Sequence, residues 1–170
     1  SVFYNTDSGD YAGTILLGST IDGNSTSSKY NSGVGKDALG SITSGARNIG
    51  FGYLSSSNIT SGSDNSSIGA YSLENTTGDG NTAFGSQSLK NNSTGSYNVS
   101  NGLKALYSNT TGGYNISLGA DSMYYNTTGE FNTAIGYQSL YSKSDIENGI
   151  SNYNVAVGYK SMYSNYSGGN

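Results

Sequence analysis

An asparagine returns along this chain at a nearly constant interval, which restricts the chain to folds built from stacked repeats. The asparagines are Asn31, Asn48, Asn65, Asn81, Asn98, Asn115, Asn132 and Asn154. Successive members are separated by a step of 17, except for one step of 16 and a last step of 22. A glycine follows at position +4 from each of them, and one more copy, with Thr14 in place of Asn, precedes Asn31 by the regular step. This spacing predicts a repeat protein of about nine units.

The amino-acid composition also favours stacked repeats over a closed globular core. Leu, Ile, Val and Phe supply only 29 of the 170 residues, a share typical of disordered chains when it is combined with high net charge. The formal net charge, however, is only −4. In a solenoid each repeat buries few side chains and neighbouring repeats cover the rest, so a low apolar content is expected.

Several classes of function are disfavoured by what the chain lacks. It contains no His and no Cys, which excludes imidazole and thiolate chemistry, and it shows no paired carboxylates of the kind a glycosidase needs. The seven basic residues are scattered, so nucleic-acid binding has no electrostatic basis. No apolar run approaches the ~18 residues of a membrane span. We therefore expect no enzyme, no metal site and no cofactor.

With the repeated Asn as position 0, the next three residues alternate between large and small side chains. This predicts a short β-strand, because successive strand side chains point to opposite faces. Position +2 is small from Gly33 to Ala156, so we expect +1 and +3 to face the core and +2 to form a flat outer face. The +3 residues predicted to be buried are Leu17, Val34, Phe51, Ile68, Phe84, Leu118, Ile135 and Val157.

A second row of large apolar residues lies at position +8 and is expected to complete the core from a second short strand. Its members are Leu39, Leu73, Leu89, Leu106, Met123, Leu140 and Met162. The glycine at +4 permits the bend between the strands, and the Ser, Asn, Thr and Gly residues after +8 favour a turn. Each copy thus predicts one flattened coil of an all-β parallel β-solenoid, stacked at about 4.8 Å into a rod about 43 Å long.

Two segments depart from the regular repeat. Residues 1–13 fall outside it and are a candidate N-terminal cap or incoming segment, whereas residues 14–170 form the repeat array. An insertion around 143–150 accounts for the long last step and contains Asp145 and Glu147. Surface insertions cost little loop-closure entropy, so it is interpreted as a plain bulge, with a recognition or cation-binding loop as the alternative.

The many asparagines allow two interpretations, an amide ladder and N-glycosylation. The asparagines at position 0 are expected to hydrogen-bond up the stack, as Asn side chains do in stacked strands, since most of them lack Ser or Thr at position +2. A second series lies in the predicted surface turns within Asn-X-Ser/Thr sequences, which are glycan acceptors. These candidate N-glycosylation sites are Asn24, Asn58, Asn75, Asn92, Asn109, Asn126 and Asn165. The alternative is that such turns simply favour Asn-Thr-Thr-Gly.

Aromatic residues also recur in two rows, one directly before the Asn and one directly after position +8. The rows contain Tyr30, Tyr97, Tyr114, Phe131 and Tyr153, and Tyr107, Tyr124, Tyr141 and Tyr163. Rings in successive coils gain about 0.5–1.5 kcal/mol per pair by stacking. Structural stacking is therefore the first interpretation and a glycan-binding strip the second.

The repeated motif resembles a known group of fibrous proteins. Asn-Thr-Ala-Ile-Gly-Tyr-Gln-Ser-Leu at 132–140, Asn-Thr-Ala-Phe-Gly at 81–85 and Asn-Val-Ala-Val-Gly at 154–158 are similar to the head repeats of trimeric autotransporter adhesins and to viral tail-fibre repeats. The resemblance implies a left-handed β-roll, three chains packed through the small-residue face at +2, and a role in attachment.

Together these observations predict a structural or adhesive fibre segment located outside the cell, on a cell surface or on a virion. Its expected partner is itself, as a trimer or an end-to-end filament, and surface glycans are candidate ligands. No nucleic-acid partner is expected. The alternatives are a glycan-binding module that uses the tyrosines and an ice-binding solenoid that uses the aligned Thr77, Thr94, Thr111 and Thr128.

Overall fold

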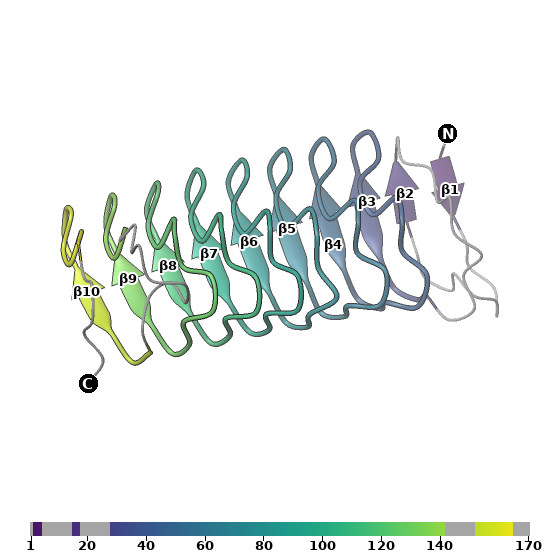
Figure 1. Ribbon diagram of the computed structural model, residues 1–170. Coiled ribbons are helices and arrows are strands. Elements are labelled where there is room, and N and C mark those ends of the chain that lie inside the picture. Colours follow the sequence, from purple (N-terminus) through teal and green to yellow (C-terminus); the bar gives the residue numbers. More distant parts are fainter. Residues whose placement is uncertain (1, 5–14, 18–27, 142–151, 165–170) are drawn as a thin grey trace.

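The computed structural model describes residues 2–4, 15–17, 28–141 and 152–164 and shows an elongated stack of coils (Figure 1). Each strand has three residues, and all belong to one sheet in sequence order. The strands are β1 (Val2–Tyr4), β2 (Ile15–Leu17), β3 (Ser32–Val34), β4 (Ile49–Phe51), β5 (Ser66–Ile68), β6 (Thr82–Phe84), β7 (Val99–Asn101), β8 (Ile116–Leu118), β9 (Thr133–Ile135) and β10 (Val155–Val157). The insertion around 143–150, Asn24 and Asn165 lie outside the described residues.

Equivalent positions of the repeats lie beside one another in the sheet. β2 to β10 pair in parallel, and β1 pairs antiparallel with β2. Ala134, for example, pairs with Ser117 of the preceding coil and with Ala156 of the following one, although the insertion separates β9 from β10 in the sequence. The predicted parallel β-solenoid, with one coil for each repeat, is therefore confirmed.

The strand side chains point the opposite way from the prediction. Position +2 faces the interior, and Ala83, Ser100 and Ala134 are fully buried. The predicted core at +3 is wrong, because these side chains lie on the outer surface and Leu118 is half-buried. The exposed members are Val34, Phe51, Ile68, Phe84, Ile135 and Val157. The side chain of Leu17 lies outside the described residues.

The interior of the coil is too thin for large side chains on the strand. A Cβ on Gly50 would lie 3.2 Å from Leu39 Cγ, because the +8 side chain of the preceding coil already fills this space. Opposite +2 lies position +7, which is also small, and Ser88 Oγ donates to Ser100 Oγ at 2.8 Å. Two facing columns of Gly, Ala and Ser are thus the sequence signal for the true interior.

Position +8 supplies the apolar core but not from a strand. Its side chains are fully buried in the described coils from Leu39 to Leu140, whereas Met162 is 37% exposed. Within those coils, positions +4 to +8 form a turn with positive φ at +4, +6 and +8, so the predicted second strand is wrong. Positive φ crowds a branched Cβ, which explains why Leu and Met, rather than Ile or Val, occupy +8.

The turn continues the hydrogen bonding between coils that the strands begin. At position +8 the N–H of Leu89 donates to the carbonyl of Ala105 at 2.9 Å, and the same bond recurs where Leu106 donates to Ser122 at 3.0 Å. The glycine at +4 packs against its counterpart in the next coil, so that a Cβ on Gly102 would lie 2.5 Å from the carbonyl of Gly119. The coils therefore stack backbone on backbone at this corner.

Candidate functional site

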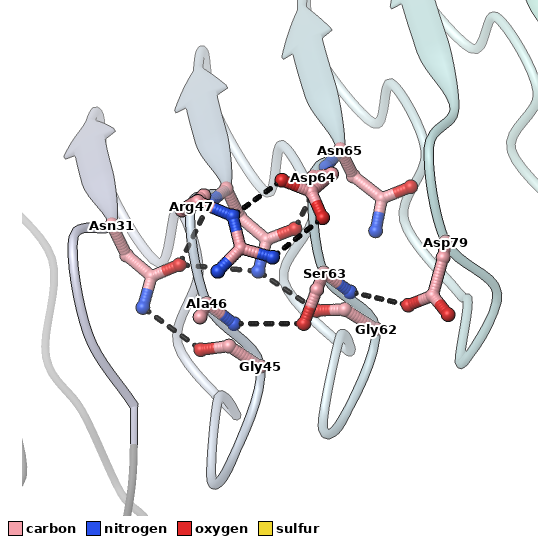
Figure 2. A network of polar contacts seen from close by, with 10 residues as sticks. Asn31, Gly45, Ala46, Arg47, Gly62, Ser63, Asp64, Asn65 and Asp79 are labelled. Atoms are coloured by element: carbon pink, nitrogen blue, oxygen red, sulfur yellow. Dashed lines mark hydrogen bonds and ion pairs between the residues drawn. The ribbon is translucent and has the colours of Figure 1, made fainter.

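The asparagines at position 0 form a buried ladder along the rod. In each regular step the side-chain Oδ1 accepts the backbone N–H of the next Asn, as in Asn48 N to Asn31 Oδ1 at 2.8 Å. The Nδ2 group of Asn31 donates to the carbonyl of Gly45, at the end of its own coil, at 3.0 Å (Figure 2). All eight are 0–4% exposed. The side-chain amides are thus used in hydrogen bonds inside the rod, and in the folded protein they are too buried to carry a glycan.

The predicted glycosylation series divides into buried and accessible members. Asn92, Asn109 and Asn126 are fully buried, and Asn109 Nδ2 donates to Asn92 Oδ1 at 2.7 Å and to the carbonyl of Gly112 at 2.9 Å. A glycan on Nδ2 would remove one of these donors and could not fit inside the coil. The prediction of surface acceptors is therefore wrong for these three.

The single shortened step explains this division. Asn58 and Asn75 occupy position +10, where Asn58 is exposed and its Nδ2 donates to Asn75 Oδ1 at 2.8 Å. The coil that begins at Asn65 lacks one residue, so a constant spacing of 17 carries the series to position +11 at Asn92. Position +11 faces inward, where Ile59 fills the equivalent place in an earlier coil.

The missing residue in the coil that begins at Asn65 also places the four threonines of the ice-binding alternative at two different positions of the repeat. Thr77 occupies position +12, whereas Thr94, Thr111 and Thr128 occupy +13. Thr77 Oγ1 also donates to the carbonyl of Ser93 at 3.1 Å. The four residues therefore do not form one flat column of free hydroxyl groups.

Rings of the two aromatic rows stack between coils, continuously from Tyr97 to Tyr153 in the first row, whereas in the second row Tyr124 and Tyr141 lie 5.6 Å apart and are tilted by 34°. In the row before the Asn, Tyr114 and Phe131 lie 4.9 Å apart with an interplanar angle of 5°, and Phe131 and Tyr153 lie 5.2 Å apart at 5°. In the row after +8, Tyr107 and Tyr124 lie 5.0 Å apart at 12°. Tyr114 and Phe131 each have a stacked ring on both faces, which restricts access to those faces. A sugar stacks on a ring face, and this arrangement favours the structural interpretation.

Charged residues replace aromatic ones in part of the first row. Arg47 Nε and Nη2 donate to the two carboxylate oxygens of Asp64 at 2.6 and 2.7 Å (Figure 2). The hydrogen bond from Arg47 holds the pKa of the Asp64 carboxyl below its ordinary value. Both side chains are more than half exposed, so the pair adds little to stability. Next to them, the backbone N–H of Ser63 donates to Asp79 Oδ1 at 2.7 Å.

The surface that sequence reasoning missed is the outer sheet face, defined here as the +1 and +3 side chains of β3 to β10. Eleven of its sixteen residues are apolar and none is charged. From Val34 to Ile135 the exposed large members keep 38–44% of their surface accessible. In the part of the chain that the structure describes, no other element covers them.

Comparisons with protein-family models, curated proteins and solved structures found no match. Among the described residues, no three His, Cys, Asp or Glu side chains lie close enough to hold a metal ion. The described segments likewise include no helix with the length and hydropathy of a membrane crossing. Function is therefore inferred from the surfaces of this chain.

Alkaline pH is expected to destabilise the rod through Tyr141. Burial, and then the neighbouring Tyr125, raise the pKa of Tyr141 to about 12, whereas an unfolded tyrosine ionises near pH ~10. The unfolded state therefore loses its proton first, and the free energy of unfolding falls as the pH rises from about 10 to 12. Urea unfolding across this range should show a smaller loss for Tyr141→Phe, and an equal loss in both proteins would contradict the assignment.

Proposed function

We propose that the chain is a segment of a non-enzymatic structural or adhesive fibre, a stiff rod that associates side by side with copies of itself. The observation that carries this proposal is the outer sheet face, a regular apolar surface on a molecule whose described interior is filled by its own side chains. Contiguous exposed apolar patches larger than a few hundred Å² usually mark interaction sites. Here the patch runs along β3 to β10.

A second copy of the chain is the partner whose surface best fits this face. Both copies would carry the same spacing between coils, so a ridge formed by Phe51, Ile68 and Phe84 can lie between the ridges of its neighbour along the whole length. The absence of charge on the face avoids burying unpaired ions, which costs several kcal/mol each. A partner whose side chains are not spaced at the distance between coils would fit the ridges of this face at only a few coils.

The size of the face sets the expected strength of association. Eight strands at about 4.8 Å, each three residues wide, give about 400 Å² per copy. Two such faces would bury about 800 Å², below the ~1,200–2,000 Å² of stable interfaces. Exposed Tyr53, Leu103 and Tyr137, which follow the +4 glycine after their strands, would enlarge the contact. We expect association at micromolar concentrations that becomes stronger with each added coil.

Sedimentation equilibrium of a surface variant tests this proposal. Phe84→Ser combined with Ile135→Ser removes two large apolar side chains from the +3 row of the face, and it should shift the protein towards the monomer with a loss of unfolding free energy below about 1 kcal/mol. The matched control is Leu106→Ala, which empties the interior and should cost about 2–5 kcal/mol. Wild-type protein that stays monomeric at every concentration, or a surface variant that unfolds like Leu106→Ala, would overturn the proposal.

The extracellular location and the attachment role are parts of the same proposal. The motif similarity to adhesin heads and tail-fibre repeats supports them. Packing of three chains through the small +2 face is ruled out, because that face is the interior of the coil. Within the proposed fibre, Asn58 and Asn75 are the acceptors best placed to carry glycans.

A further inference from the structure

The row of tyrosines after position +8 holds phenol rings of successive coils next to each other. Tyr141 and Tyr163 lie 5.0 Å apart with nearly parallel rings, and Tyr107 and Tyr124 are also 5.0 Å apart. Each pair joins two successive coils, and the rings are partly accessible at their edges. Two phenols bond through carbons at the ring edge, so each face-stacked ring must turn out of the stack before the carbons beside the two hydroxyl groups can meet. The 5.0 Å between centroids keeps the two rings within reach of each other for this movement.

We propose that this tyrosine row is an oxidative cross-linking site, at which a peroxidase acting with hydrogen peroxide joins Tyr141 to Tyr163 and Tyr107 to Tyr124 as dityrosine. Each phenol loses one electron and one proton to give a phenoxyl radical. The two radicals form a carbon–carbon bond between their Cε atoms, and the coupled rings regain aromaticity by moving the two ring protons to the oxygens. One hydrogen peroxide takes up the two electrons and two protons and becomes two water molecules.

The composition of the chain directs oxidation to these rings. There are 16 Tyr but no Cys and no Trp, so the side chains that usually compete for one-electron oxidants are missing. Of the two methionines, Met123 is fully buried and Met162 lies beside the row itself. A radical formed on one tyrosine therefore has another tyrosine as its nearest reactive neighbour.

The link would join the two coils that are separated by the longest step in the sequence. Tyr141 belongs to the coil before the long last step, and Tyr163 belongs to the coil after it. A covalent bond here closes a loop of the unfolded chain in the way a disulfide does, and comparable loops stabilise by amounts that raise the melting temperature by about 5–10 °C in a protein of this size. A chain without disulfides could be hardened after folding by this reaction.

Tryptic peptide mapping after limited treatment with horseradish peroxidase and hydrogen peroxide tests the proposal. Cleavage after Lys104, Lys143 and Lys160 places Tyr141 in peptide 105–143 and Tyr163 in peptide 161–170. We expect these two peptides to appear joined, with a mass two hydrogens below their sum, and fragmentation to locate the bond at Tyr141 and Tyr163. The treated protein should also melt at a higher temperature.

Two controls make the result specific to the folded row. Tyr163→Phe leaves Tyr166 in the same peptide, so its joined species should fall at least tenfold if stacking directs the coupling. Protein unfolded in urea during oxidation should show no preference for the Tyr141 to Tyr163 bond. The proposal is overturned if Tyr163→Phe or unfolding leaves the joined peptide unchanged, or if folded protein gives only links between separate molecules.

Discussion

Gly102→Ala is expected to destabilise the rod by about 2–5 kcal/mol, the sum of left-handed backbone strain and overpacking. Gly102 has a φ of 147°, and an added Cβ would lie 2.5 Å from the carbonyl of Gly119 in the next coil. Backbone atoms cannot rotate away as a side chain can, so the two coils must separate. Urea unfolding followed by circular dichroism measures the loss.

The same substitution at Gly158 separates the two causes. Gly158 also has a positive φ, 123°, but a Cβ there meets no atom within 4 Å. Gly158→Ala should therefore cost only the strain, about 1–2 kcal/mol. Equal losses for the two variants would show that contact between glycines of neighbouring coils does not limit the stack.

Removing residues 98–114 is expected to leave a folded rod that is one coil shorter, whereas removing residues 98–105 should abolish cooperative unfolding. The long deletion joins Tyr97 to Asn115, so Tyr97 takes the place of Tyr114 and Asn81 becomes the ladder neighbour of Asn115. Stability in such arrays is roughly the sum of repeats and their interfaces. The loss should therefore be about that of one coil and its contacts.

The short deletion removes the same strand but destroys the register. It takes out Asn98, β7 and the Gly102 corner, and it leaves Leu106 in a coil that has no strand of its own. The shortened coil can then no longer form the backbone hydrogen bonds that connect the coils before it to the coils after it. Thermal unfolding and small-angle X-ray scattering distinguish the outcomes, and similar damage from both deletions would contradict one coil per repeat.

The period and the stacking direction could be predicted because they follow from spacing alone. Asn and Gly at fixed separations require identical environments in each copy, and only parallel stacking of coils places equivalent positions beside one another. The inward Leu and Met at +8 could likewise be predicted, since they recur as the largest apolar residues of the second half-repeat. The buried Asn ladder follows from the same regularity.

The orientation of the strand could not be predicted from alternation, which identifies two faces but not which one is inside. The usual preference for large apolar residues in the core pointed to Phe84 and Ile135. It failed because Leu39 and its equivalents leave space only for Gly, Ala and Ser at +2. The burial of Asn92 was missed for a different reason, because a constant spacing of 17 concealed the one-residue shift after Asn65.

That shortened coil also divides the rod into two kinds of module. Before it, the interior corner at +11 holds Ile42 and Ile59, and after it the corner holds amides from Asn92 onward. Thr76 stands between them at +11, and its Oγ1 accepts from Asn92 Nδ2 at 3.0 Å. Adding a unit within either half would therefore keep like side chains stacked at this corner, whereas a unit transplanted across Thr76 would set an amide over a hydrocarbon.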